Sequence, residues 1–175
     1  MRIRSAIAVS TASAAAALTL LTSATPGQAA AGPARPARCA EKALTVHARA
    51  VPGDPTVLRT DVTNRSGRAC LVDRVPTVTF GNLDGIALPT PRDGRGTYRL
   101  AAGGTAYADV RTIGDPADPE ARRVGTVTVA ASAAHGGRSF TAAHLGTGRK
   151  VLVWEPVTTW WQPSAAAADR GIGLS

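Results

Sequence analysis

The 175-residue sequence predicts an all-β protein, an antiparallel β-sandwich of about seven or eight short strands. Three observations predict this class. Short runs of apolar residues alternate with polar ones at a period of two, as in a strand with one buried face. Turn signals rich in glycine, proline and asparagine recur about every 8–12 residues. After the N-terminal leader, no window of about ten residues has the 3.6-residue period of an amphipathic helix.

The first three predicted strands lie between residues 44 and 80. In residues 44–50, leucine, valine and alanine alternate with polar side chains, and Pro-Gly-Asp-Pro at 52–55 is a turn. Residues 57–64 alternate in the same way and end in an Asn-Arg-Ser-Gly turn. Residues 75–80 are the third β-prone run, closed by the Gly-Asn-Leu-Asp-Gly turn at 81–85.

The segment 88–96, Leu-Pro-Thr-Pro-Arg-Asp-Gly-Arg-Gly, is predicted to be a loop. Its two prolines lack backbone donors, and its two glycines favour turns. Residues 97–100 are expected to be a short strand before a turn at 101–104, and residues 106–110 alternate again.

The C-terminal part continues the same pattern. Residues 114–120 form a second long loop, and the expected strands are residues 124–131, 139–145 and 151–154. A hairpin turn at Gly136-Gly137 precedes the second of these. Residues 164–175 are too weakly apolar to bury, so they are expected to be a flexible tail behind a sandwich domain of residues 39–163.

The N-terminus has the three parts of a secretory signal peptide. Arg2 and Arg4 precede an uncharged run over residues 6–21, and small residues follow. Cleavage is expected after Ala29 or Ala31, which leaves a Pro/Ala-rich spacer up to residue 38. A retained anchor helix is the alternative, although the run is short for a bilayer that needs about 20 apolar residues. The arginines are not adjacent, so general secretion to the outside of the cell is the expected route.

The charge is basic but scattered. The chain has a formal net charge of +8, and Arg122-Arg123 is its one adjacent arginine pair after the leader. A nucleic-acid interface would gather its cations on one face with interleaved aromatics. We therefore expect no nucleic-acid partner, while attraction to anionic wall polymers or lipid head groups stays open.

The two cysteines, Cys39 and Cys70, both lie in the part expected outside the cell. In an oxidising compartment such a pair is interpreted as one disulfide. Zinc-like ligand spacing and the Cys-x-x-Cys redox motif are both missing.

Several short motifs occur in a fixed order between residues 39 and 129. They are a cysteine after the leader, the short Leu44/Val46 strand, the Asn-Arg-Ser-Gly turn, Cys70-Leu71, the Val-Pro-x-Val segment at 75–78 and Leu-Ala-Ala-Gly-Gly-Thr-Ala at 100–106. In these motifs the chain resembles a family of secreted actinobacterial proteins known as domain of unknown function 4232. The resemblance implies an immunoglobulin-like sandwich with Cys39 bridged to Cys70. Many members carry a second cysteine pair that this chain lacks, and the family supplies no catalytic residues to transfer.

Catalytic and metal-binding signals are weak. His47 lies on the polar side of the first strand, whereas His135 and His144 flank the predicted hairpin and could face each other. Two histidines without a nearby carboxylate are a poor metal site. Motifs for a serine nucleophile, a zinc protease or a nucleotide-binding loop are absent from the sequence. We therefore expect no metal and no cofactor.

The acidic trio Asp115, Asp118 and Glu120 lies in the second long loop. Its oxygens could hold Ca²⁺, but the loop lacks the glycine turn and final glutamate of a dedicated site. Free solvation is the favoured interpretation. Paired carboxylates for glycoside hydrolysis would need burial to separate their pKa values, which such a loop does not provide.

The one unusual cluster holds all three tryptophans, Trp154, Trp160 and Trp161. Trp154 is expected in the core or at an edge. Trp160 and Trp161 are neighbours, so in an extended backbone they point to opposite faces. They are the candidate binding residues, for a sugar ring or a protein partner. The alternative is that both cover an apolar edge.

Together these features favour a secreted, non-catalytic binding module. Its expected partner is a cell-wall polymer, a glycan or another envelope protein, and a monomer is the default state. The alternative function is a small secreted enzyme, or an enzyme inhibitor, with a dispersed site.

Overall fold

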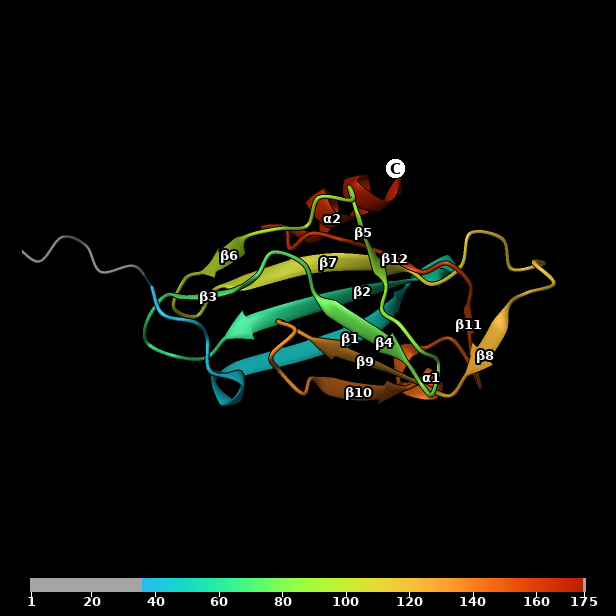
Figure 1. Cartoon of the computed structure of the whole chain (residues 1–175), viewed down its shortest axis with the longest axis horizontal. Helices are drawn as coiled ribbons and strands as arrows, with labels where there is room; N and C mark the ends of the chain where they lie inside the picture. The colour runs from blue at the N-terminus through green and yellow to red at the C-terminus, as the bar shows by residue number, and fades with distance from the viewer. Residues whose placement is uncertain (1–35, 175) are drawn as a thin grey trace, which may run out of the picture. The chain divides into compact units, whose positions relative to one another are not determined.

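The computed structural model describes residues 36–174. Within this range the fold is an all-β sandwich, as predicted. A five-stranded sheet has the order β1-β2-β7-β12-β5, and a three-stranded sheet has the order β10-β9-β4 (Figure 1). Two further antiparallel pairs, β11–β8 and β3–β6, extend the layers at their ends.

The strands are short, and their bounds follow the alternating sequence pattern. They are β1 (Leu44–Val51), β2 (Asp54–Asn64), β3 (Cys70–Asp73), β4 (Thr77–Phe80), β5 (Leu88–Thr90), β6 (Thr97–Leu100), β7 (Thr105–Arg111), β8 (Arg122–Val124), β9 (Thr126–Ala130), β10 (Arg138–Thr141), β11 (Val151–Val153) and β12 (Val157–Thr159). The helices of residues 36–174 are short: η1 (Glu41–Ala43), α1 (Ala142–Leu145) and α2 (Ala165–Ile172).

Apolar side chains from both sheets meet in the core. Leu58 and Val110 of the larger sheet pack against Val78, Phe80 and Val127 of the smaller sheet. These positions alternate with polar residues along each strand, so one face of each sheet is buried. The predicted alternation in β1, β2 and β7 is confirmed.

The Cys39–Cys70 disulfide is present, as predicted. It lies in a second apolar cluster with Val72, Leu100 and Trp161. The residues around it are paired as well. The Cys39 N–H donates to the Leu71 carbonyl at 2.9 Å, and Arg38 forms an ion pair with Asp73.

The predicted loop at 88–96 is wrong for its first three residues, which form β5. This strand pairs in parallel with β12, so one ladder of the sandwich is not antiparallel. The Leu88 N–H donates to the Pro156 carbonyl at 2.9 Å. Pro89 is tolerated because β5 is an edge strand, and alternate residues of a strand turn their backbone groups away from the neighbouring strand.

Other boundaries were also predicted imperfectly. The expected strand at 124–131 is split at Gly125 into parts of β8 and β9, which pair with different partners. The expected strand at 139–145 ends at Thr141, whose hydroxyl accepts from the His144 N–H and begins α1. Short runs of three residues, such as β12, carry too little alternation to be detected.

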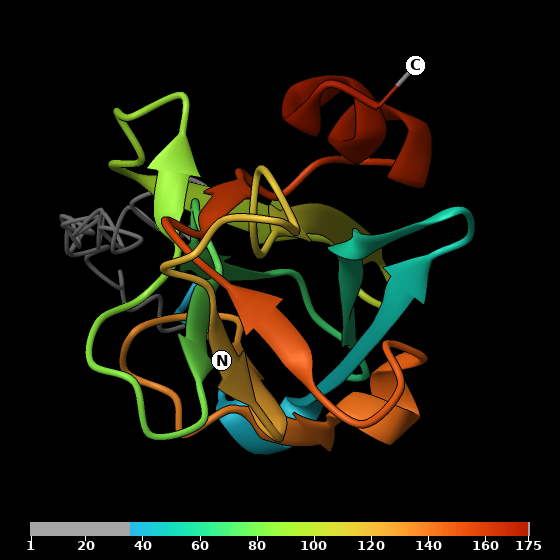
Figure 2. The same ribbon diagram turned by 90° about the vertical axis from the view of Figure 1, so that its right-hand side faces the viewer.

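The flexible tail predicted for residues 164–175 is wrong over α2. The Ser164 hydroxyl accepts from the Ala167 N–H at 3.2 Å, and Gly173 ends the helix at φ +81°. Ala168 and Ile172, one turn apart, are buried. Figure 2 shows this helix, in red, outside the strands of the sheet. A serine before an alanine run and a glycine after it were the available sequence signals.

The predicted signal peptide and most of the predicted spacer lie outside the described residues. Among residues 36–174, no helix is both long and apolar enough to cross a membrane.

Candidate functional site

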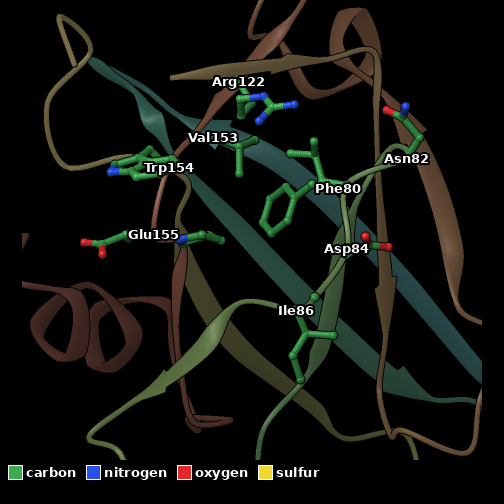
Figure 3. Close-up of a pocket in the computed structure, with 11 residues that line it drawn as sticks. Phe80, Asn82, Asp84, Ile86, Arg122, Val153, Trp154 and Glu155 are labelled. Atoms are coloured by element: carbon green, nitrogen blue, oxygen red, sulfur yellow. The ribbon is translucent and has the colours of Figure 1, made fainter. Parts of the chain in front are cut away.

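A surface hollow that combines apolar and charged side chains lies between two loops. One is the β4–β5 loop, residues 81–87, and the other is the β11–β12 turn, residues 154–156. They enclose a hollow of about 410 Å³. In Figure 3, Phe80 and Val153 form its middle, with Trp154 and Glu155 on one side and Asn82 and Asp84 on the other.

A second hollow of about 540 Å³ continues along β5. The two hollows share Ile86, Glu155 and Pro156 among their lining residues. We call the combined surface the β5 groove. Its lining residues are Phe80, Asn82, Leu83, Asp84, Gly85, Ile86, Leu88, Arg92, Arg122, Val153, Trp154, Glu155, Pro156 and Val157.

Two aliphatic side chains in the groove face solvent. Ile86 is 49% exposed and Leu88 is 55% exposed, and they are the exposed large hydrophobic residues of the described chain. Single exposed apolar residues are common on protein surfaces. Two of them in one groove, beside Pro156 and Val157, are instead typical of an interaction site.

The backbone of both loops is fixed by local geometry. Gly81 has φ +55°, and a Cβ at this position would lie 3.1 Å from the Val124 Cβ. The Leu83 N–H donates to the Phe80 carbonyl, and the Ala87 N–H donates to the Val78 carbonyl. These bonds anchor the loop at both ends and so place Ile86 beside the groove.

The opposite rim contains a strained residue. Glu155 has φ +45°, in the left-handed region that residues with a Cβ adopt at a cost. The following residue is Pro156, which restricts its neighbour further. Strain of this kind is concentrated at functional sites. Here it allows a three-residue turn to place Trp154 and Glu155 together on the rim.

The edge of β5 itself is protected from further strand pairing. Leu88 directs its N–H toward β12, so the backbone of the next residue, Pro89, faces outward. Proline has no N–H to offer there. A single proline thus disfavours the pairing of an added strand with this edge. A partner in the groove would therefore be bound through side-chain contacts.

The rims carry charges without partners. Asp84 and Glu155 are exposed on opposite rims, and Arg122 lies at one end. None of the three forms an ion pair within residues 36–174. In contrast, Asp54, Asp61, Asp73, Asp109 and Asp169 all have cationic or histidine partners. The groove therefore offers free carboxylates on a protein that is basic overall.

The structure separates the two candidate tryptophans. Trp161 is 2% exposed, packs near the disulfide and has no surface to offer a ligand. Trp160 is half-buried, with the Arg74 guanidinium 4.0 Å from its ring centre. Its Nε1–H donates to the Pro91 carbonyl at 3.2 Å. One ring face is thus already covered by a cation, while Trp154 lies on the rim of the groove.

The histidines are dispersed. His47 is exposed, with Nδ1 3.1 Å from an Asp61 carboxylate oxygen. His135 Nε2 lies 3.2 Å from the Cys39 carbonyl oxygen and donates to it, whereas His144 lies in α1, beyond the other end of β10. The predicted possibility that His135 and His144 face each other is therefore wrong.

Two of the three predicted acidic side chains bond to backbone groups of their own loop. The carboxylates of Asp115 and Asp118 accept from the N–H groups of Ala117 and Glu120. In the part of the chain that the structure describes, no group of three metal-ligating side chains comes together.

Sequence reasoning missed the two residues that define the groove. Leu88 begins the segment predicted to be a loop, and Ile86 lies between that loop and the predicted turn at 81–85, where single apolar residues attract no attention. The available signal was two large aliphatic side chains among prolines and glycines. It also missed the burial of Asp109, which lies on the polar face of its strand but is 0% exposed.

A family model described as "Domain of unknown function (DUF4232)" matches residues 39–161. The match begins at Cys39 and ends at Trp161, so it includes both sheets and both rims of the groove and stops before α2. No curated protein and no solved structure matches the chain.

Proposed function

Because this chain belongs to the DUF4232 family, whose description assigns no activity, we propose from its own surface that it is a non-catalytic binding module. The β5 groove is its binding site. The observation that carries this proposal is the exposure of Ile86 and Leu88 in one groove. Each side chain is about half exposed, so covering both would contribute about 1–1.5 kcal/mol each, roughly half the value for full burial.

The groove favours one kind of partner, a protein segment with an aliphatic side chain next to a lysine or arginine. The aliphatic side chain would fill the space beside Ile86 and Leu88. The cation would meet Asp84 and Glu155, which lack partners within the described residues. Such charges add selectivity and association rate more than affinity.

The proposed location of the protein is outside the cell, at the envelope. The Cys39–Cys70 bridge supports it, because structural disulfides persist in oxidising compartments. The partner would then be another exported protein or a protein displayed at the surface.

A binding role is favoured over an enzymatic one because the carboxyl group best suited to acid–base chemistry is buried. Asp109, the carboxyl group with the largest upward pKa shift in the described residues, is fully buried under α2. A substrate cannot reach it in this conformation. The alternative, a small enzyme with a dispersed site, has no comparable cluster to support it.

The tryptophan site remains a second candidate, for a glycan, and Trp160 is its one accessible residue. Sugar rings stack on an open aromatic face, and Arg74 occupies one face of this ring. The groove is therefore the better-supported site.

The test uses three synthetic pentapeptides, Ala-Lys-Leu-Lys-Ala, Ala-Lys-Ala-Lys-Ala and Ala-Glu-Leu-Glu-Ala, each with blocked ends. Binding is followed by amide chemical shifts of the protein. We expect the first peptide to bind at least tenfold more tightly than the other two, with shifts confined to residues 80–92, 122 and 153–157. Equal binding of all three, or shifts elsewhere, would contradict the proposal.

The matched variants add two aspartates at different places. Ile86→Asp/Leu88→Asp places them in the groove and should abolish peptide binding. Ala102→Asp/Ala134→Asp places them at exposed positions in other loops and should leave it unchanged. A Trp160→Ala variant separates the second candidate, since it should retain peptide binding and lose any retention on purified cell-wall glycan.

A further inference from the structure

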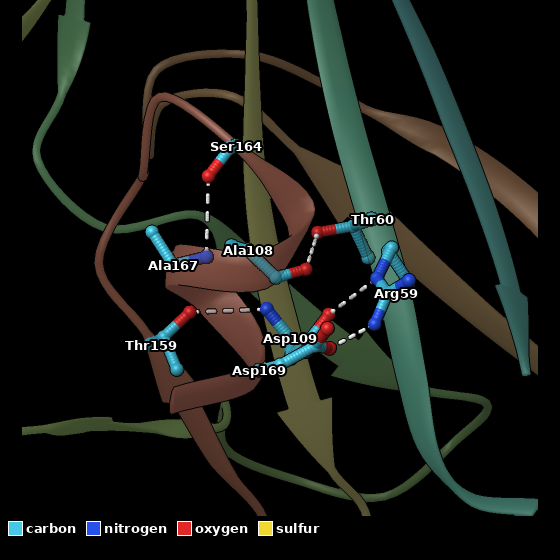
Figure 4. Close-up of polar contacts among 8 residues, drawn as sticks. All are labelled: Arg59, Thr60, Ala108, Asp109, Thr159, Ser164, Ala167 and Asp169. Carbon is cyan, nitrogen blue, oxygen red and sulfur yellow. Dashed lines mark hydrogen bonds and ion pairs between the residues drawn. The ribbon is translucent and has the colours of Figure 1, made fainter. Parts of the chain in front are cut away.

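One buried cluster has no part in the groove. On the outer face of the five-stranded sheet, Arg59 of β2 lies directly opposite Asp109 of β7. The Arg59 Nε–H donates to Asp109 Oδ1 at 3.2 Å. The same guanidinium also bonds Asp169 of α2 through Nη2 (Figure 4). Two carboxyl groups from distant parts of the chain thus share one cation.

The environment of the second carboxyl oxygen of Asp109 favours a protonated side chain. Asp109 Oδ2 is buried and accepts no hydrogen bond from the described residues. An ionised carboxylate so placed would be costly. If the oxygen carries a proton, it becomes a donor to the adjacent Asp169. Burial first, and then this hydrogen bond, raise the pKa of Asp109 to about 7, although Arg59 opposes the change.

The cluster is neutral only with that proton. One guanidinium balances one carboxylate, so the second carboxyl group must be protonated for the buried charges to cancel. Loss of the proton leaves one excess negative charge beneath α2. The excess is relieved when Asp169 moves into water, because Arg59 and Asp109 then form a neutral pair.

Asp169 is carried by α2, and its side chain is 28% exposed beside Arg59, so the helix holds it at the edge of the cluster. Ala168 and Ile172 are the buried side chains of the helix. Arg111 Nη2 donates to the Ile172 carbonyl at 3.0 Å. The helix also lies beyond the range that the family model matches.

Other charged and titratable groups surround the cluster. They are Arg49 on β1, Asp54 and Asp61 on β2, Tyr107 and Arg111 on β7, and Arg170 on α2, while β12 contributes the uncharged Thr159. Two of the carboxylates have partners of their own, since Asp54 lies 3.8 Å from Arg111 and Asp61 lies 3.1 Å from His47. Within 4 Å, Arg59 is the one cation that Asp109 and Asp169 share, and Arg49 and Arg170 form no ion pair among residues 36–174.

We infer that Asp109 and Asp169 form a proton-binding site that latches α2 onto the outer face of the sheet. With the proton bound the helix is docked and covers Asp109. Without it the helix is released, and the outer face of β7 and β12 is uncovered. The sandwich core takes no part in this change, because Asp109 lies on the face opposite to Leu58 and Val110.

The experiment is backbone hydrogen exchange of the intact, disulfide-bonded protein between pH 5.5 and 8.5. Rates are converted to protection factors, which removes the intrinsic effect of pH on exchange. We expect protection of residues 165–173 to fall at least tenfold across this range and by a larger factor than that of β2 and β7, whose slowest amides report global unfolding. Constant protection of the helix would overturn the inference.

Two variants identify the groups. Asp109→Asn keeps the shape of the protonated acid without a proton to lose, so its helix should stay protected at every pH. Asp61→Asn removes a carboxylate from the same sheet face outside the cluster and should behave as the unmodified protein does. An equal fall in Asp109→Asn and the unmodified protein would overturn the inference.

A direct measurement covers the case in which Asp109→Asn does not fold. The carboxyl carbon of Asp109 is followed by NMR over the same range. One titration step is expected, and Asp169→Asn should move it to lower pH. The absence of any step between pH 5.5 and 8.5 would overturn the inference independently of the variants.

Discussion

The Asn64 side chain donates a hydrogen bond from Nδ2 to the Ala101 carbonyl at 2.9 Å, across 37 positions of sequence. The same nitrogen donates to the Arg68 carbonyl, and Oδ1 accepts from the Ser66 N–H. The Asn-Arg-Ser-Gly turn and the Leu-Ala-Ala-Gly-Gly-Thr-Ala turn are therefore one structure, joined by a buried amide. The hydrogen bonds of Asn64 therefore explain why both of these motifs, which are separate in the sequence, occur in the chain.

Asn64→Ala should lower the free energy of unfolding by about 2–3 kcal/mol, because it leaves buried carbonyls without donors. Urea unfolding followed by tryptophan fluorescence measures this change. Ser66→Ala is the comparison: it removes a half-buried hydroxyl that donates to Asn64 Oδ1 and the Arg68 carbonyl, but it keeps both Asn64 Nδ2 bonds, so it should cost only about 1 kcal/mol. Equal losses in the two variants would contradict the assigned role of Asn64.

Cys39→Ala/Cys70→Ala should lower stability by about 3–4 kcal/mol, the chain-entropy value for a loop with a sequence separation of 31. The same urea titration, with and without reductant, measures it. Reductant should affect the unmodified protein and leave the double variant unchanged. A loss below about 1 kcal/mol would mean that packing in the apolar cluster around the bridge stabilises this part of the sandwich without the disulfide.

The strands that could be predicted are those whose alternation is enforced by the core. In β2, Leu58, Thr60 and Val62 are all buried, so the period of two is visible in the sequence. Pro89 concealed β5, because its tolerance in a strand depends on lying at the sheet edge. That position is a property of strand order, which the sequence pattern does not contain.

The sites were harder to predict for the same reason. Asp109 and Asp169 are 60 positions apart, and each has an ordinary polar context in the sequence. They meet only because α2 folds back on β7. Likewise, Ile86 and Leu88 become notable only when the β11–β12 turn faces them. The prediction that Trp160 and Trp161 point to opposite faces needed only the geometry of an extended chain.

Trp161→Ala should cost about 3–5 kcal/mol, because it empties a buried site beside the disulfide. Trp160→Ala should cost about 1 kcal/mol, for the loss of an exposed cation–π contact and one hydrogen bond. Urea unfolding followed by far-UV circular dichroism measures both variants. Similar costs would contradict the assignment of Trp161 to the interior and Trp160 to the surface.

Glu155→Gly should raise the free energy of unfolding by about 0.5–1 kcal/mol, since glycine adopts φ +45° without strain but has more freedom when unfolded. Glu155→Gln is the matched control, because it keeps the strain and removes only the charge. Both variants should weaken binding of the Lys-Leu-Lys peptide. A glycine variant no more stable than the glutamine variant would show that the turn is unstrained.

The stability of the protein should fall as pH rises from about 4 to about 7, and Asp109 is the cause. Its pKa is raised from 3.8 to about 7 in the folded protein, so the folded state holds a proton that the unfolded state releases over this window. Where the folded state binds more protons, unfolding becomes easier with rising pH. One proton gives a slope of at most about 1.4 kcal/mol per pH unit.

Urea unfolding at pH 5, 6, 7 and 8 measures the slope, and the difference between the unmodified protein and Asp109→Asn isolates the contribution of Asp109. Backbone N–H groups of Gly137 and Gly136 lower the pKa of Glu41 below 4.5, so Glu41 acts in the opposite direction and only in more acidic solution. It therefore does not mask the slope above pH 5. Parallel curves for the two proteins from pH 5 to 7 would show that Asp109 is already ionised at pH 5, and that Arg59 alone compensates both carboxylates.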